Sequence, residues 1–160
     1  MIIGAISDTH IPRRAKNLPP KVFEAFADVD LILHAGDLVS EEVLVELGAL
    51  APVKAVVGNC DPLYLAHDLS FQLKLELAGY RIGLTHGHLG TGNTVPERAL
   101  SLFEDVDLVV FGHSHSPYNE TVNGIHLFNP GSATDRRWEP KCSVGIIELG
   151  RGIECRHIFF

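Results

Sequence analysis

The sequence is poor in cysteine and has no long apolar run, and each absence excludes a class of protein. Only three cysteines occur in 160 residues, an odd number without paired spacing. We therefore expect no disulfide framework, and a reducing, cytoplasmic location is the simpler prediction. No run reaches the roughly 18 apolar residues of a membrane span, so no membrane association is expected. Residues 1–8 carry no basic segment, which argues against a secretory signal peptide.

Positive charge is also scarce. Lys and Arg number 13 against 20 Asp and Glu, which leaves a net charge of −7. This balance makes nucleic acid and anionic lipid unexpected partners. Apolar residues make up 46% of the chain and charged residues 21%, an ordinary globular composition. The length predicts one domain over residues 1–160. Histidine is the exception to the pattern of scarcity, with nine residues, four of them in two His-x-His pairs.

Apolar periodicity predicts an α/β protein. In the first half, apolar runs at 2–6, 31–35 and 53–57 alternate with helical patterns that start at Pro19-Pro20 and at Ser40. Strands alternating with helices favour βαβ units and a parallel sheet.

The second half is predicted to be richer in strands. Residues 71–77 alternate strictly and should form a hairpin with 80–85 through Ala78-Gly79. Thr94-Val-Pro-Glu97 predicts a capping box opening a helix to about Glu104. Further strands are expected at 107–111, 118–122, 125–128, 143–149 and 153–159. Two mixed sheets packed face to face with helices outside, an αββα sandwich, would bury these apolar faces.

Polar side chains follow five of the predicted strands at the point where each strand ends. Because ligand sites in α/β sheets form outside the carboxyl ends of strands, we expect these side chains to converge. Glycines 36, 58, 87 and 112 stand beside them and would allow sharp turns and close approach. The candidates are Asp8, His10, Asp37, Asn59, His86, His113 and His115.

This set of ligand types indicates a metal site. Imidazole and carboxylate groups suit Mn, Fe, Co, Ni or Zn. Seven candidates exceed one tetrahedral ion, so two divalent ions are predicted, with Asp37 able to bridge them. Paired ions stabilise the attacking and leaving oxygens of an in-line displacement and acidify a bound water.

The order of these motifs resembles the calcineurin-like metallophosphoesterase superfamily. Asp8-x-His10, Gly36-Asp37, Gly58-Asn59, His86-Gly87 and Gly112-His113-x-His115 carry the resemblance, and Asn129-Pro130-Gly131-Ser132 is similar to the family's late turn. The compact length resembles the small bacterial and archaeal phosphodiesterase branch. The resemblance implies hydrolysis of a small phosphodiester or phosphomonoester by a hydroxide bridging two ions, with manganese the first choice.

The resemblance also implies an assignment for each ligand. One ion would be held by Asp8, His10, Asp37 and His115. The other would be held by Asp37, Asn59, His86 and His113. Asp37 and Asn59 thereby count as catalytic residues.

Cys60 departs from the family pattern. Many members read Gly-Asn-His-Glu/Asp at the third motif, where the His helps to protonate the leaving group, and this chain has Cys60 there. Such acid help is typically worth about 10²–10⁴-fold in rate. Either His88 supplies the proton, as a catalytic residue, or the substrate has a good leaving group.

Other residues and other functions stay open. His34 is either a support for the metal ligands or a core histidine. Two basic segments either contact a ligand or are ordinary surface, namely Arg13, Arg14 and Lys16, and Arg136-Arg137-Trp138. The second segment could also form a contact between copies of the chain, so a homo-oligomer is left open. A scaffold of the same fold, as in the retromer-type subunit, is the alternative to an enzyme, but the complete ligand set favours the enzyme. A nuclease is disfavoured by the acidic charge and the short chain.

Overall fold

The computed structural model describes all 160 residues, which form two five-stranded β-sheets. The first sheet has the strand order β10 (Ile153–Phe159), β9 (Ser143–Leu149), β1 (Ile2–Ile6), β2 (Leu31–His34), β3 (Val53–Ala55). The second has the order β4 (Gln72–Leu77), β5 (Tyr80–Thr85), β6 (Leu108–Val110), β8 (Ile125–Asn129), β7 (Tyr118–Val122). Both sheets are mixed. Strands β1, β2 and β3 pair in parallel in the first sheet, and β5, β6 and β8 in the second, with antiparallel strands outside them.

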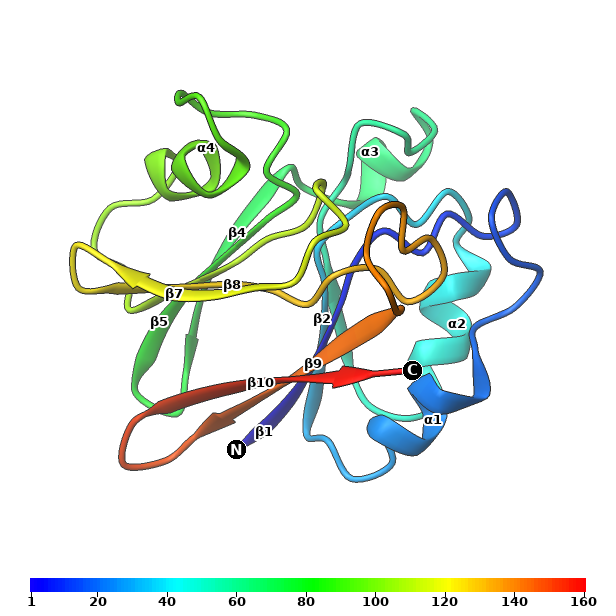
Figure 1. Cartoon of the computed structure of the whole chain (residues 1–160), viewed down its shortest axis with the longest axis horizontal. Helices are drawn as coiled ribbons and strands as arrows, with labels where there is room; N and C mark the ends of the chain where they lie inside the picture. Colours follow the sequence, from blue (N-terminus) through cyan, green and yellow to red (C-terminus); the bar gives the residue numbers. More distant parts are fainter.

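The helices lie on the outer faces of the two sheets. Helices α1 (Pro20–Ala25) and α2 (Glu42–Gly48) pack on the first sheet, and α4 (Val95–Ser101) packs on the second. Figure 1 shows α1 and α2 on one side of the molecule and α4 on the other, with the strands between them. The predicted αββα arrangement is therefore confirmed. No helix is long and apolar enough to cross a bilayer.

Alternation of side chains explains why the sheets face each other. A strand presents successive residues to opposite faces, so one set enters the space between the sheets while the other faces the helices. Ile3 and Ala5 of β1 lie in the central core, whereas Ile6 packs under α1 and α2. The central core is completed by buried residues of both sheets, among them Leu31, Leu33, Ile82, Leu84, Leu108, Val110, Phe128 and Ile147.

The ends of several elements differ from the sequence prediction. The strand expected at 53–57 ends at Ala55, and beyond it Val56 makes only an isolated bridge to Ser70. The helix expected to reach Glu104 ends at Ser101. Helix α3 (Leu65–Asp68) was not predicted, because its single turn is too short for a periodic pattern. The hairpin is confirmed, and Ala78 and Gly79 both have positive φ, as a two-residue turn of type I′ requires.

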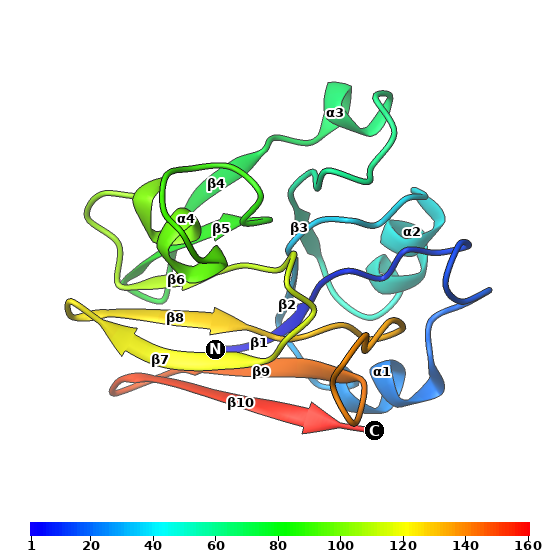
Figure 2. The same ribbon diagram turned by 45° about the horizontal axis from the view of Figure 1, so that its top comes forward.

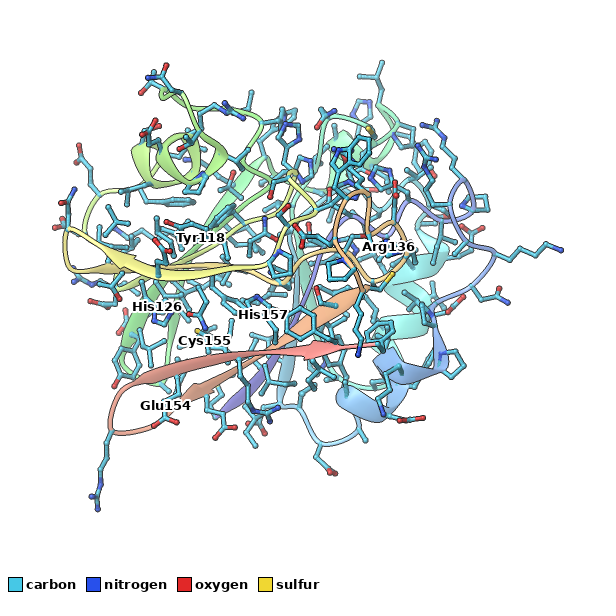
Figure 3. All side chains as sticks on the ribbon, viewed as in Figure 1. Tyr118, His126, Arg136, Glu154, Cys155 and His157 are labelled. Carbon is cyan, nitrogen blue, oxygen red and sulfur yellow. The ribbon has the colours of Figure 1, made fainter.

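Phe128 fills the centre of the contact between the sheets. Its side chain is fully buried, and the ring of His157 stacks on it at 4.7 Å between centroids, reaching in from β10 (Figure 3). The His157 ring nitrogen Nε2 lies 2.7 Å from the carbonyl oxygen of Asn129, which fixes the imidazole in place. On the opposing β9, Gly145 leaves the space that the Phe128 ring occupies, since a Cβ there would overlap the ring.

We predict that Gly145→Ala destabilises the fold by about 1–3 kcal/mol, the usual cost of an overpacked core. The Phe128 ring is held by the His157 ring that stacks on it, and the Cβ of Ala5 would crowd the added methyl group as well. Urea unfolding followed by circular dichroism measures the change. Gly150→Ala is the matched control, since its added Cβ would meet no atom within 4 Å. Equal stability of the two variants would contradict the packing described.

Candidate metal centre

The seven candidate ligands follow strands whose carboxyl ends point the same way within each sheet. Asp8 and His10 follow β1, and Asp37 follows β2. His86 follows β5, while His113 and His115 follow β6 in the other sheet. Figure 2 shows the segments after β1, β2 and β6 meeting where the two sheets adjoin. Each sheet therefore contributes part of one cluster.

Most of these side chains stand on backbone in the left-handed region. Positive φ angles of 44–70° occur at Asp8, His10, Asp37, His113 and His115. This region costs an L-residue roughly 1–2 kcal/mol, although Asp, Asn and His tolerate it better than other side chains. The sharp turn lets the chain leave the strand at once while the side chain stays at the sheet edge. Gly58 is required in the same crowded region for another reason, because a Cβ at this position would overlap the carboxylate of Asp37.

One half of the cluster gathers around Asp8. Its Oδ1 lies 3.2 Å from His115 Nε2 and 3.9 Å from His10 Nε2. The two imidazoles stack at 5.1 Å, with their Nε2 atoms 3.2 Å apart. All three side chains are buried.

Asp37 joins this half to the other. Its Oδ2 lies 3.5 Å from His10 Nε2 and 3.3 Å from His86 Nε2. Asn59 Oδ1 in turn lies 3.2 Å from His86 Nε2. One ligand atom from each residue comes within 4.8 Å of the others in three overlapping groups, namely Asp8/His10/His115, Asp8/Asp37/His86 and His10/Asp37/Cys60.

His113 and His88 lie at the border of the cluster. The His113 ring meets the His86 ring edge-on at 5.1 Å, but it belongs to none of the three close groups. His88 is half-buried, 5.3 Å from the His86 ring and 6.2 Å from the exposed ring of Phe71. Its Nδ1 is buried without a hydrogen-bond partner. The predicted roles of both histidines stay predictions.

Backbone carbonyls hold two of the imidazoles in position. His86 Nδ1 lies 2.7 Å from the carbonyl oxygen of Ala35, and His115 Nδ1 lies 2.5 Å from that of Asp135. A carbonyl can only accept, so each Nδ1 carries a proton and each Nε2 faces the carboxylates of the cluster. Metal-binding histidines are commonly fixed in this way.

Asp61 is a supporting residue to which the sequence reasoning gave no role. Its Oδ2 accepts from the backbone N–H groups of Asp37 at 3.0 Å and Gly58 at 2.8 Å, and its Oδ1 accepts from Val39 at 2.6 Å. One carboxylate thus ties the loops after β2 and β3 together. Its place at the end of Gly58-Asn59-Cys60-Asp61, where the family pattern has an acid, was the available signal.

Cys60 supplies its backbone to the site, and its sulfur is also near. The Cys60 N–H donates to Asp37 Oδ1 at 2.8 Å, and the sulfur lies in the close group with His10 and Asp37. Burial, followed by the charge of Asp37, raises the pKa of the thiol to about 11. The side chain is therefore a neutral thiol at neutral pH, and it is a poor substitute for the histidine of the family pattern.

His34, whose role the sequence left open, is a fully buried neutral support. Its Nδ1 accepts from the Gly36 N–H at 3.2 Å, so Nε2 carries the proton and donates to Thr9 Oγ1 at 3.1 Å. Burial lowers the pKa of His34 to about 3. The imidazole links the loops after β1 and β2 without reaching the cluster itself.

The charges of the cluster call for a cation. Burial opposes ionisation of Asp8 and Asp37, but contacts with His115 and His86 outweigh it, and both carboxyls have a pKa below the usual value. Burial likewise opposes a proton on His86, but Asp37 and Asp8 hold the pKa of this imidazole above its ordinary value. No Lys or Arg side chain forms an ion pair with either carboxylate.

The residues present fit a bound metal. Asp8 Oδ1 is buried with no hydrogen-bond partner. An unsatisfied buried carboxylate oxygen destabilises a folded protein, and a bound cation would compensate it. Imidazole nitrogens and carboxylate oxygens aimed at a shared point are the usual donors for divalent first-row ions. The fold and the cluster together resemble those of metal-dependent phosphoesterases, whose paired ions are held by ligands of these types.

Comparisons with known proteins agree with this class. Residues 1–152 match the family model of the calcineurin-like phosphoesterase superfamily domain, and the chain belongs to that superfamily. A probable metallophosphoesterase of Methanothermobacter thermautotrophicus is 47% identical over 135 residues, which cover 84% of this chain and 78% of that protein.

Two solved structures show the same fold. An archaeal phosphodiesterase superposes with a TM-score of 0.77 at 28% identity, covering 100% of both chains. Vps29 of Entamoeba histolytica, solved in complex with zinc, gives a TM-score of 0.79 at 25% identity, covering 99% of both chains. The resemblance inferred from the motifs is thereby confirmed at the level of the family.

We predict that Asp61→Asn lowers the affinity for a divalent metal by about 10–100-fold, the usual loss when a supporting partner is removed. The amide keeps one accepting oxygen, so either the Val39 N–H or the N–H groups of Asp37 and Gly58 lose their acceptor, and the common anchor of the two loops weakens. Calorimetric titration of the metal-free protein with Mn²⁺ measures the affinity. Asp68→Asn, at an exposed site on α3, is the matched control. An unchanged affinity in Asp61→Asn would contradict the supporting role.

We also predict that the metal-free protein loses stability on acidification partly through His34. The unfolded chain takes up this proton near pH 6.5, whereas the folded protein takes it up only near pH 3. The contribution is therefore complete above pH 6.5 and is lost as the pH falls towards 3, by up to ~1.4 kcal/mol per pH unit.

The measurement is the slope of the unfolding free energy against pH between about 6 and 4, with a chelator present. His34→Asn should give a shallower slope than the natural protein, and His67→Asn, at an exposed site, should not. Equal slopes for all three proteins would show that His34 is not buried in its neutral form.

Proposed function

We propose that this protein is a phosphodiesterase that hydrolyses a small phosphoester with two divalent cations. The observation that carries the proposal is the cluster in which Asp8, His10 and Asp37 are each shared between two close groups of ligand atoms. A single set would suit one ion, whereas overlapping sets joined through Asp37 suit a pair of ions with a bridging carboxylate.

The distances support a division of the ligands into two sets. Asp8, His10 and His115 surround one point, and Asp37 Oδ2 borders the same space. The second set is Asp37, Asn59, His86 and His113, in which Asn59 and Asp37 both lie within 3.3 Å of His86 Nε2. Manganese remains the first choice, with nickel, cobalt, iron and zinc as alternatives for the same donors.

The cations, when bound, would acidify a water and neutralise the phosphate oxygens. The protein's own part is to hold these groups still. Ala35 and Asp135 carbonyls keep the Nε2 atoms of His86 and His115 aimed at the centre, and Asp61 keeps the Asp37 loop in place. Fixed dipoles and charges of this kind avoid reorganisation during the reaction.

We infer that His88 donates the proton to the leaving group. It lies next to His86, it is partly exposed, and its buried Nδ1 has no protein partner. Burial, followed by the charge of His86, lowers the pKa of this imidazole, so the negative charge of the phosphate would have to keep its proton in place. Cys60 is the weaker candidate, because a thiol with a pKa of about 11 releases its proton reluctantly.

A scaffold role is the second candidate, supported by the close likeness to Vps29. The scaffold and the enzyme differ in what they need from the cluster. A scaffold would bind a partner in fixed stoichiometry whatever the state of the cluster, whereas an enzyme would turn over phosphoesters only with the metal ligands intact. The nearly complete burial of Asp8, Asp37, His86 and His115 around one point favours the enzyme.

We predict that Asp37→Ala and His86→Ala each reduce hydrolysis of an activated aryl phosphodiester by about 10²–10³-fold, the scale of losing a principal electrostatic element. The amount of bound metal should fall in parallel, because Asp37 would be shared by both ions. Initial rates with Mn²⁺, Ni²⁺, Co²⁺, Mg²⁺ and Zn²⁺ and elemental analysis of the purified protein provide the two readouts.

Asp28→Ala and His67→Ala, both at exposed positions outside the cluster, serve as matched controls and should keep full activity. Circular dichroism confirms that each variant is folded. Undiminished hydrolysis in Asp37→Ala or His86→Ala would refute the proposed function, and so would a natural protein that binds a partner but turns over no phosphoester with any of the five metals.

A further inference from the structure

The loop between β8 and β9 ends in a tight turn that carries the chain's single tryptophan. The Glu139 N–H donates to the Arg136 carbonyl at 2.8 Å, and the Arg136 guanidinium donates to the Glu139 carbonyl at 2.6 Å. Arg137 and Trp138 therefore occupy the two central positions of a closed turn. Trp138 is 98% exposed, more than any other large apolar side chain. Figure 3 marks the position of Arg136 on this loop.

The base of this loop is fastened to the metal-binding segments. Ser132 Oγ donates to the carbonyl of Asp8 at 2.8 Å, and Thr134 Oγ1 donates to that of Thr9 at 2.6 Å. One residue further, the Asp135 carbonyl accepts from His115 Nδ1. Three successive anchors thus connect the turn to Asp8 and His115, so Trp138 stands on a rigid support beside one half of the cluster.

A cavity of about 270 Å³ opens between this turn and the segment after β1. It is lined by Arg14, Asp135, Arg137 and Trp138. Its volume is at the lower end of ligand pockets, which suits one ring system with a sugar better than an oligomer.

The charges of the cavity differ from those of the whole chain. Arg14 Nε pairs with Asp135 Oδ2 at 3.2 Å, which leaves the charge of Arg137 uncompensated in the lining. The lining is therefore net positive in a protein whose net charge is −7. The uncompensated guanidinium of Arg137 next to an exposed indole combines anion binding with a flat stacking surface, and Arg14 adds the N–H donors that its pair with Asp135 does not use.

We propose that this cavity binds the nucleoside part of the substrate, which makes the substrate a nucleoside phosphodiester. The base stacks on Trp138, Arg137 and Arg14 meet the sugar and phosphate oxygens, and the scissile phosphorus lies over the cluster next to His115. This inference rests on the proposed phosphodiesterase function, because it names the substrate class of that same site. Stacking on an aromatic ring favours a ligand that carries a base over one without a base, and all four bases can stack in this way.

The single tryptophan makes binding directly measurable, because all indole fluorescence comes from Trp138. The probe is adenosine 5′-monophosphate, added to the full-length protein, once metal-free and once with Mn²⁺. We expect saturable quenching by adenosine 5′-monophosphate and none by ribose 5-phosphate, which has the same charge without the base. Equal responses to the two, or no response to either, would overturn the proposal.

Variants of Arg14 and Arg137 test the part of the site proposed to meet the sugar and phosphate. They retain Trp138, so its fluorescence still reports binding. Arg14→Ala and Arg137→Ala should each lower the affinity for adenosine 5′-monophosphate about tenfold, the scale of one charge-assisted hydrogen bond. Arg151→Ala, exposed on the β9–β10 turn, is the matched control and should bind as the natural protein does. Unchanged affinity in both arginine variants would show that the arginines do not contact the nucleotide and that this cavity is not the binding site.

Kinetics separate stacking from general damage to the loop. Trp138→Ala should lower the ratio of kcat/KM for an aryl diester to that for a dialkyl diester by about tenfold, mainly through KM, and Trp138→Phe should restore most of it. Phe159→Ala, which removes another exposed aromatic ring, should leave the ratio unchanged. A Trp138→Ala variant that slows both substrates equally would assign the turn a structural role only.

The outcomes also separate this inference from the proposed function. Quenching without hydrolysis would leave a nucleotide site and refute the enzyme, whereas hydrolysis without quenching would keep the enzyme and refute the nucleotide site. If dilution of the protein alone shifts the Trp138 emission to longer wavelength, the indole is covered by a second copy of the chain, and the proposal fails in favour of a homo-oligomer.

Discussion

Two buried carboxylates without a neighbouring Lys or Arg are the constraint on which this structure depends. Asp8 and Asp37 lie at the carboxyl ends of adjacent parallel strands and are almost free of solvent. Such charges are tolerated only when opposite charge or hydrogen bonds compensate them. Backbone N–H groups and imidazoles supply part of the compensation, and the strained left-handed turns exist to bring them there. A cation supplies the remainder in the arrangement that we propose.

The sequence was sufficient for the fold and for most of the cluster because both follow from local patterns. Apolar runs gave the strands to within a residue or two, and the polar residue after each strand gave the candidate ligands. Helix α3 could not be predicted, because one turn has no period. Asp61 was missed because its role depends on three backbone groups from two loops, which come together only in three dimensions. The support by Asp135 was invisible for a similar reason, since it acts through its carbonyl rather than its side chain.

The two sheets contribute different members of the cluster, and each half of the cluster contains ligands from both sheets. The first sheet provides Asp8, His10 and Asp37, and the second provides His86 and His115. Neither sheet could assemble the ligand set alone. The hydrophobic surface between them, centred on residues such as Phe128, therefore determines the spacing of the polar groups at its edge. The division also places two unlike surroundings beside the cluster, with His88 and Phe71 on one side and the Trp138 turn on the other.

The meeting of both sheets at one set of ligands has a consequence for the abundance of the protein. A cation bound there, as we propose, would clamp the two layers together, because only the folded chain brings these ligands to one point. Binding to the native state alone raises stability with the logarithm of the free ligand concentration. Under the proposed metal binding, the folded fraction would be coupled to the supply of free divalent ions, and a shortage of metal would expose the chain to proteolysis.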